Sequence, residues 1–316
     1  MNLIADIISF SSDQKNVSDN EAVATVGFFD GLHAGHRFLM SELKRIAGLK
    51  SAVSMVLTFT EHPRKALKQP YIPRLLTTFD EKKQLFAQTG IDKLVVLNFT
   101  PKFSHFTAEE FIGLLAKEFN VRYLLTGYDH RFGKNRTDGF QDYVKYGNKH
   151  GVEIIQADVY SCENVHISAT GIRRLIESGN IRQANRYLTY RYRLEGEVVK
   201  GRQFGHTIGF PTANIDVTSS EKIFPEPGVY AVRTYFDDSQ YDGMMNIGYH
   251  PTIEISSKLL FEVHLFDYDG NIYGKKITVE FVDFVRKEIK FSDIRQLQTH
   301  LEEDKHKIIN ILKTCG

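Results

Sequence analysis

Short hydrophobic runs alternate with helical patterns up to about residue 188 of the chain. Between the runs, apolar residues recur at helical spacing, as at Leu39, Leu43 and Ile46. Strand and helix in alternation predict right-handed crossovers and a parallel, doubly wound α/β sheet, which binds ligands at the carboxyl ends of its strands. The runs rich in Val, Ile and Leu are typical of strands covered on both faces, and they span 22–29, 51–59, 92–99, 121–127 and 152–158.

The pattern changes after residue 190, where strand-like runs follow one another without crossover helices. Gly, Pro and Asp turns separate them, which favours an antiparallel barrel or sandwich. A last helix carries an apolar stripe from Ile294 to Leu312, and Ser292 is its predicted N-cap. We therefore expect two domains, 1–185 and 186–316, with the second one antiparallel. Its strands are expected at 192–201, 228–236, 241–248, 259–267 and 275–285.

Composition narrows the class of protein. Of the 316 residues, 40 are Lys or Arg and 39 are Asp or Glu, so the net charge of +1 gives no broad footprint for nucleic acid. Cys162 and Cys315 form no C-x-x-C pair, which suits a reducing cytoplasm. Asp6 interrupts the first apolar run, and no run reaches membrane-spanning length. We expect a cytoplasmic protein, a monomer or weak homo-oligomer, with no nucleic-acid or membrane partner.

Residues 25–40, TVGFFDGLHAGHRFLM, place two histidines where a strand turns into a helix. Gly27 and Gly31 let the backbone approach a ligand, and a helix N-terminus favours phosphate. His33 and His36 are three residues apart, so both imidazoles can donate hydrogen bonds to the same phosphate group. A well-packed pair of histidines at a helix cap would explain part of the pattern, and so would a metal site, although no further ligands are evident nearby.

This H-x-G-H turn resembles that of the nucleotidyltransferase superfamily, which has a Rossmann-like fold. Four blocks resemble the prokaryotic FAD synthetase domain in their order: 58–67, 74–83, 99–111 and 127–139. The segment 166–184 resembles the second phosphate-binding motif of that family. The resemblance implies ATP contacts from His33, His36, Gly27, Phe28, Asp30, Gly31, Ser168, Thr170 and Arg173, and flavin contacts from Asp129 and Asn98. Asp129 could instead help to place a magnesium ion.

Two positions depart from the family pattern in the second phosphate motif. Ala169 stands where Ser is usual, and Gly171 stands where Arg is common. The loss of that charge weakens phosphate stabilisation unless Arg173, Arg174 or Arg136 compensates. An ordinary capped helix is the alternative interpretation of this segment.

Residues 201–216, GRQFGHTIGFPTANID, combine glycines with oxygen-bearing side chains. Gly201, Gly205 and Gly209 suit a loop around phosphates, and Thr212 and Asn214 offer the oxygen ligands that Mg²⁺ prefers. A glycine-rich hairpin is the simpler alternative. On 259–267, alternation puts Glu262 on the face opposite Phe261 and Val263, where it is either an ion-pair partner or a general base.

These segments resemble the flavokinase domain. The G-F-P-T-A-N block is followed in family order by blocks at 224–231, 246–252 and 262–267, and 270–291 continues the match. The resemblance implies that Gly201, Gly205 and Gly209 bind ATP, that Thr212 and Asn214 bind Mg–ATP, and that Glu262 is the catalytic base. His250 stands where Arg is frequent, and the junction at 189–192 lacks the usual Gly-Arg-Pro.

Nearly the whole chain thus resembles the bifunctional riboflavin kinase/FAD synthetase family. The resemblance implies that riboflavin and ATP give FMN, and that FMN and ATP give FAD and pyrophosphate, with Mg²⁺ accompanying ATP. One alternative is a monofunctional riboflavin kinase whose first domain has become a nucleotide- or flavin-binding module, a reading that Gly171 favours. A nucleotidyltransferase acting on another acceptor and a fragment of a class I tRNA synthetase are the others.

Overall fold

The structure is a computed structural model of the 316-residue chain. It describes residues 6–10, 20–128, 130–134, 137–162, 165–201, 208–217, 221–249 and 259–314. The chain forms two compact units, Met1–Ser168 and Ala169–Gly316. The predicted boundary at 185–186 lies further along the chain, and as a boundary between functional domains it stays a prediction.

A parallel sheet forms the first unit, and its strand order is β1-β4-β3-β2-β5-β6. All of its pairings are parallel, which confirms the predicted doubly wound α/β class. The hydrophobic pattern does not predict β1, which adds an edge to the sheet beside β4. The strands are β1 (Asp6–Phe10), β2 (Ala22–Val26), β3 (Val53–Phe59), β4 (Lys93–Leu97), β5 (Val121–Thr126) and β6 (Glu153–Gln156).

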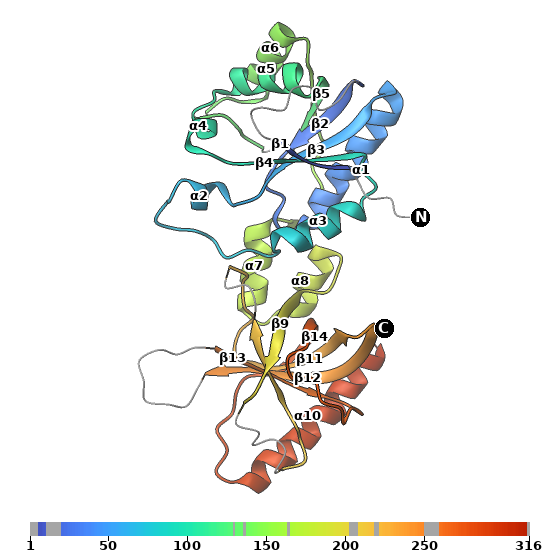
Figure 1. Cartoon of the computed structure of the whole chain (residues 1–316), viewed down its shortest axis with the longest axis vertical. Helices are drawn as coiled ribbons and strands as arrows, with labels where there is room; N and C mark the ends of the chain where they lie inside the picture. The colour runs from blue at the N-terminus through green and yellow to red at the C-terminus, as the bar shows by residue number, and fades with distance from the viewer. Residues whose placement is uncertain are drawn as a thin grey trace. The chain divides into compact units, whose positions relative to one another are not determined.

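Helices cover both faces of this sheet, because its apolar strands expose side chains on either side. Helices α5 (Ala108–Glu118) and α6 (Phe140–His150) cover one face, and α1 (Ala34–Lys50) covers the other (Figure 1). The core under α5 takes alternate residues of β2, namely Ala22, Ala24 and Val26. The other elements of the unit are η1 (Asp30–Leu32), α2 (Pro63–Ala66), α3 (Phe79–Ala87), α4 (Pro101–Ser104), β7 (Ser161–Cys162) and β8 (Val165–His166).

The strand order reverses beside β2. The chain runs from β2 outward to β3 and β4, and then returns to place β5 on the other side of β2. The carboxyl ends of β2 and β5 therefore adjoin, and helices leave them on opposite faces of the sheet. Such a switch point is where open α/β sheets bind their ligands.

The second unit contains a closed antiparallel barrel, with the strand order β10-β13-β12-β11-β14-β9, which confirms the predicted barrel. The pattern does not predict β10, whose alternation of polar and apolar residues is short and follows the G-F-P-T segment. The barrel strands are β9 (Arg193–Val199), β10 (Ala213–Val217), β11 (Gly228–Phe236), β12 (Ser239–Tyr249), β13 (Leu259–Leu265) and β14 (Lys276–Arg286). The helices are α7 (Ala169–Glu177), α8 (Ile181–Leu188) and α10 (Ile294–Thr314).

Helix α10 packs on the barrel through the later part of its stripe. Ile308 and Leu312 are buried against β11, β12 and β14, whereas Ile294 is 52% exposed. The N-cap is Asp293 and not Ser292, because the Asp293 carboxylate accepts a hydrogen bond from the backbone N–H of Gln296 at 2.9 Å. Aspartate and serine are equally favourable N-cap residues, so the sequence alone does not show whether Ser292 or Asp293 caps the helix.

A buried ion pair joins α10 to the barrel. Asp304 is 1% exposed, and one of its carboxylate oxygens lies 2.7 and 2.9 Å from two nitrogens of the Arg286 guanidinium on β14. A buried carboxylate is costly unless it is paired, and here the pair is satisfied at short range.

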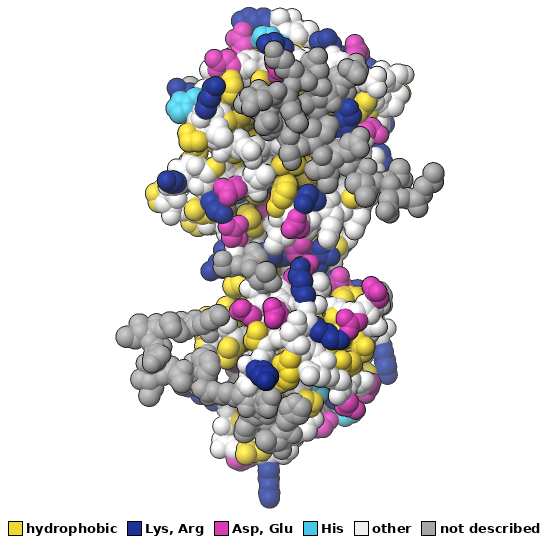
Figure 2. Space-filling model, viewed as in Figure 1, with side chains coloured by type: hydrophobic (Ala, Val, Ile, Leu, Met, Phe, Trp, Pro, Cys, Tyr) yellow, Lys and Arg dark blue, Asp and Glu magenta, His cyan; other side chains and the backbone are white. Residues whose placement is uncertain are grey.

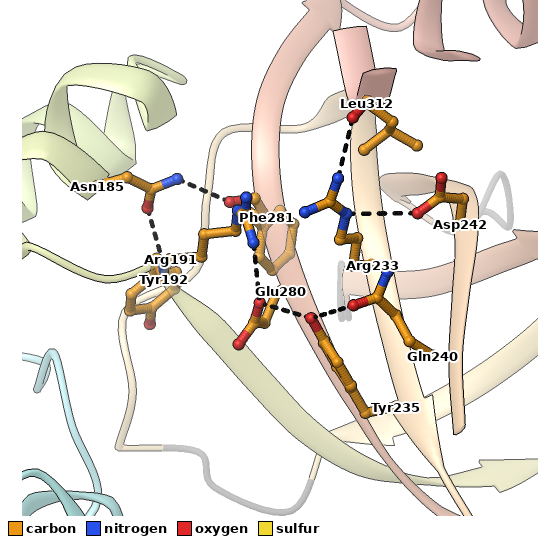
Figure 3. A network of polar contacts seen from close by, with 10 residues as sticks. All are labelled: Asn185, Arg191, Tyr192, Arg233, Tyr235, Gln240, Asp242, Glu280, Phe281 and Leu312. Carbon is orange, nitrogen blue, oxygen red and sulfur yellow. Dashed lines mark hydrogen bonds and ion pairs between the residues drawn. The ribbon is translucent and has the colours of Figure 1, made fainter. Parts of the chain in front are cut away.

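Helix α8 is held on the barrel by hydrogen bonds as well as by apolar contacts (Figure 3). The Asn185 side chain donates to the Phe281 carbonyl at 2.8 Å and accepts from the Tyr192 N–H at 2.7 Å. Arg182 pairs with Asp283 on β14. Ile181, Ala184 and Leu188 of the same helix are fully buried. Figure 3 also shows Arg233 on β11 donating to the Leu312 carbonyl of α10.

Acidic and basic side chains are interspersed over the described part of the face drawn in Figure 2. No helix in the described residues is long and apolar enough to span a membrane.

We expect the fragment 169–316 to be more stable than the fragment 186–316. The shorter fragment lacks α7 and most of α8, including Asn185, so the Phe281 carbonyl and the Tyr192 N–H lose this partner, which costs about 1–3 kcal/mol per unsatisfied group. Its melting temperature should be lower by roughly 5–10 °C, as measured by circular dichroism. Asn185→Ala in the longer fragment is the matched control and should account for part of the difference. Equal melting temperatures for the two fragments would show that α8 does not support the barrel.

Candidate active sites

The turn that follows β2 has an unusual backbone. Phe29, Gly31 and Leu32 have positive φ angles of 53°, 75° and 34°. Only glycine adopts this region freely, so the conformations of Phe29 and Leu32 cost about 1–3 kcal/mol each unless their surroundings enforce them. Such outliers concentrate at functional sites, and this one leads directly into His33 and α1.

His33 and His36 share one side of this turn, as their spacing predicts. Their rings are stacked, with centroids 3.7 Å apart, and the Phe29 ring stands perpendicular to His36 at 5.2 Å. His33 is 5% exposed and precedes the first residue of α1, while His36 lies in its first turn. The pair therefore stands beside the unpaired N–H groups of the helix N-terminus, which attract anions.

Electrostatics keep His36 neutral. Burial, above all, lowers the pKa of its imidazole well below 6.5, and nearby His33, His130 and Lys82 lower it further. The Nδ1 atom of His36 is buried and has no hydrogen-bond partner among the described residues. A neutral imidazole still has one N–H to donate, so it can stabilise an oxyanion without giving up a proton.

Asp30, predicted to contact ATP, is 4% exposed and bonds within the protein. Its carboxylate accepts hydrogen bonds from the backbone N–H of Leu76 and from the N–H and hydroxyl of Thr77, at 3.0–3.2 Å. The Thr77 hydroxyl also accepts from the Gly31 N–H at 3.1 Å. These bonds attach residues 76–77 to the turn, so Asp30 holds the turn in position.

The other predicted residues of the first unit lie at the carboxyl edge of the sheet or outside the described residues. Gly27 and Phe28 follow β2, and the exposed Asn98 follows β4, where its side chain accepts from the Thr60 hydroxyl at 3.4 Å. Because β3 lies between β2 and β4, Asn98 is two strands away from the histidine turn. Asp129 and Arg136 lie outside the described residues, although neighbouring His130 follows β5 and acts electrostatically on His36.

Ser168 is the last residue of the first unit, and Thr170 and Arg173 belong to α7 in the second. Ala169 begins α7 and Gly171 lies in its first turn. The segment thus spans the boundary between the two units, and its contribution to phosphate binding stays a prediction.

In the barrel, the register of three strands aligns polar side chains around Glu262. Glu262 on β13 lies directly opposite Asn214 on β10 and directly opposite Asn246 on β12. Directly paired residues share one face of a sheet, with Cβ atoms about 4.5–5.5 Å apart. Phe261 and Val263 are buried on the other face, as the alternation predicts. The sequence pattern alone does not reveal Asn246, because its place beside Glu262 depends on the register.

Two contacts hold the Thr212–Asn214 segment. The backbone of Gly201 passes so close to Asn214 that a Cβ atom there would lie 1.8 Å from the amide nitrogen, so a larger residue at 201 would displace the Asn214 side chain. His264, two residues after Glu262, binds the Pro211 carbonyl through Nδ1 at 2.7 Å. A carbonyl only accepts, so this Nδ1 carries the proton. Burial lowers the pKa of His264, which keeps its ring neutral beside Thr212.

The remaining predicted barrel residues are only partly described. Gly209 has a positive φ of 81° and precedes the buried Phe210. Gly205 and His250 lie outside the described residues. The oxygen atoms of Thr212 and Asn214 are of the kind that Mg²⁺ takes as ligands, so this donor set suits the ion.

Two families of known proteins match successive parts of the chain. Residues 15–171 match the family described as FAD synthetase, and residues 188–312 match the family described as riboflavin kinase. A bifunctional riboflavin kinase/FMN adenylyltransferase from Listeria monocytogenes is 35% identical over 91% of each chain. A protein of the same name from Bacillus subtilis is 32% identical to this chain over 92% of each chain. A match to the FAD synthetase family favours two activities over the monofunctional alternative.

A solved structure shares the fold over nearly the full length. It is described as a macrolide-efflux protein from Streptococcus pneumoniae, and it superimposes with a TM-score of 0.87 at 29% identity, over 96% of this chain and 99% of that one. The efflux role in its description belongs to that protein.

The lowered pKa of His36 predicts an acid-sensitive stability. In the unfolded chain His36 binds a proton near pH 6.5, whereas the folded chain takes it up only at lower pH, so stability falls as the pH drops below 6.5. His36→Gln removes this contribution, which is at most about 1.4 kcal/mol per pH unit. Calorimetry at pH 7.5 and 5.5 should therefore show a smaller acid-induced decrease in melting temperature for the variant. An identical decrease would mean that His36 is not held neutral.

Proposed function

The chain belongs to the family of bifunctional riboflavin kinases/FMN adenylyltransferases, and on this premise we propose which residues carry its two reactions. The chain phosphorylates riboflavin to FMN with ATP, and it transfers AMP from ATP to FMN to give FAD and pyrophosphate. Flavins are thus its substrates and products.

For adenylyl transfer, we propose that His33 and His36 bind the phosphates of ATP at the switch point of the sheet. An oxygen of the FMN phosphate attacks the α-phosphorus, and the bond to the β-phosphate oxygen breaks to release pyrophosphate. Charge on the phosphate oxygens is redistributed during this step, and a prearranged N–H donor stabilises the transition state without reorganising. The stacking of the two rings at 3.7 Å and the neutral state of His36 support this role.

Gly27, Phe28 and Gly31 would bring backbone close to ATP, and Asp30 would hold that backbone in place through residues 76–77. Ser168, Thr170 and Arg173 are proposed to bind the triphosphate, with Arg173 in place of the charge that Gly171 lacks. Asp129 and Asn98 are proposed flavin contacts.

For the kinase reaction, we propose Glu262 as the general base. Its carboxylate takes the proton of the terminal ribityl hydroxyl as that oxygen attacks the γ-phosphorus, and ADP leaves. The observation that carries this assignment is the direct pairing of Glu262 with Asn214 across β10 and β13. Thr212 and Asn214 would hold Mg²⁺, which neutralises phosphate charge when it is bound. Gly201, Gly205 and Gly209 would line the ATP phosphates.

We further propose that the protein works in the cytoplasm as a monomer or a weak homo-oligomer, and that it binds no nucleic acid and no membrane. The balanced charge and the sparse cysteines support this. Incubating the protein with riboflavin, ATP and Mg²⁺ and resolving FMN from FAD by chromatography tests both activities at once. Release of FMN alone would contradict the adenylyl-transfer assignment.

Glu262→Gln keeps the size of the side chain but cannot accept the proton. Riboflavin phosphorylation should therefore fall by ~10²–10⁴, while FAD formation from supplied FMN persists. Glu195→Gln is the matched control, since Glu195 lies in the same barrel and pairs at its surface with Lys276. Near-normal kinase turnover for Glu262→Gln would refute Glu262 as the base.

His36→Ala removes a donor that is more effective in the transition state than in the ground state. Turnover of FMN to FAD should fall by ~10²–10³, and FMN should accumulate because the kinase is unaffected. His150→Ala, at the exposed end of α6, serves as the control. If His36→Ala lowers the melting temperature but leaves the turnover of the folded protein unchanged, the histidine only packs the turn.

A further inference from the structure

Lys82, in the middle of α3, is a buried cation with no assigned role. Its side chain is 3% exposed, and its ammonium lies 4.0 Å from the centre of the Phe28 ring. The ammonium donates to the backbone carbonyls of Phe28 and Phe59, each at 3.0 Å. Lysine is almost never fully buried unless it is paired, so this position has a specific cause.

The two carbonyls belong to the carboxyl edge of the sheet. Phe59 is the last residue of β3, and Phe28 is in the turn between β2 and the histidine pair. One ammonium therefore joins the ends of two neighbouring strands to α3. The Phe28 carbonyl also accepts from the Thr58 hydroxyl at 3.3 Å.

These bonds act on the strained part of the turn. The residue after Phe28 is Phe29, whose φ of 53° is unfavourable for a side-chain-bearing residue. Lys82 holds the chain immediately before this residue, and Asp30 holds it immediately after, through Leu76 and Thr77. Residues 76–77 lead directly into α3, which carries Lys82 back to Phe28. The turn is thus fixed on both sides by a single segment of chain.

The charge of Lys82 also reaches the histidine pair. Asp30 is the acidic group that acts on Lys82, and burial lowers the pKa of Lys82 to about 8, so the ammonium is mostly charged at neutral pH. The groups that lower the pKa of His36 by their charge are His33, His130 and Lys82. A cation in this place disfavours a second positive charge on His36 and attracts the anionic phosphates of a nucleotide.

We propose that Lys82 is a positioning residue for adenylyl transfer: it fixes the turn that presents His36 and provides a buried positive charge that acts on His36. This inference rests on the proposed role of the histidine pair. The side chain acts through the Phe28 carbonyl and through its charge, and it takes no part in proton transfer.

Lys82→Met keeps most of the side-chain volume and removes the charge and both hydrogen bonds. Because a misplaced reacting group costs about 10²-fold in rate, FMN adenylylation should fall by roughly that factor, while riboflavin phosphorylation is unchanged. Lys83→Met is the matched control, since Lys83 is the next residue, is 33% exposed and pairs with Asp80 at 2.6 Å. It should leave both activities within about twofold of the original chain.

Two further variants separate the bond from the charge. Thr58→Val removes only the second hydrogen bond to the Phe28 carbonyl and should give a smaller loss of adenylylation in the same direction. Lys82→Arg keeps the charge and should retain more activity than Lys82→Met. All variants are compared below their melting temperatures, so that unfolded protein does not contribute to the loss.

The pH profile distinguishes positioning from mere support of the fold. Removing the Lys82 charge raises the pKa of His36, so the acid limb of FMN adenylylation should move to higher pH in Lys82→Met and stay in place in Lys83→Met. The inference would be overturned if folded Lys82→Met adenylylates FMN at a rate within threefold of that of the original chain. It would also be overturned if the acid limb of the pH profile does not move in this variant. His36→Ala is the reference: if it is inactive while Lys82→Met is active, only the role of Lys82 fails, and if it is active, the role of the histidine pair fails.

Discussion

The register of hydrogen-bonded strands determines where this chain can do chemistry. In the first unit, β2 lies between β3 and β5, so the turn with the histidine pair and the segment after β5 meet at one edge. In the barrel, the ladder places Asn214, Glu262 and Asn246 in one row across three strands. A shift of one residue would move Glu262 to the face that holds Phe261 and Val263. In both sites, the pairing of backbone strands therefore determines which side chains lie next to one another.

Much of the fold is predictable from hydrophobic periodicity, because buried parallel strands and amphipathic helices leave strong patterns. The five predicted strands of the first sheet and the terminal helix are confirmed. The strands that the sequence pattern does not predict are those that form by pairing with distant segments of the chain. Strand β1 gains its place from β4, and β10 gains its place from β9 and β13. The choice between Ser292 and Asp293 as N-cap depends on backbone geometry that composition does not encode.

The site is predictable in a similar, partial way. The spacing of His33 and His36 predicts that they share a side, and their rings do stack. No local pattern predicts that the Asp30 carboxylate is bound by residues 76–77, or that Lys82 reaches the Phe28 carbonyl, since each contact spans more than forty positions along the chain. The predicted roles of Ser168, Thr170, Arg173 and Asp129 remain predictions. Ser168 ends the first unit, Thr170 and Arg173 belong to the second, and Asp129 lies outside the described residues.

The ion pair between Arg286 and Asp304 bears on how the protein is made. During synthesis the barrel strands leave the ribosome before α10, because α10 follows β14 in the chain. Until Asp304 emerges, Arg286 lacks its carboxylate partner. The apolar barrel residues that later pack against Ile308 and Leu312 are exposed to solvent during this time. The second unit therefore completes its fold only after α10 has emerged, whereas the first can fold earlier. A ribosome that stops before α10 would release a chain whose first unit is whole and whose barrel exposes an uncovered, aggregation-prone face.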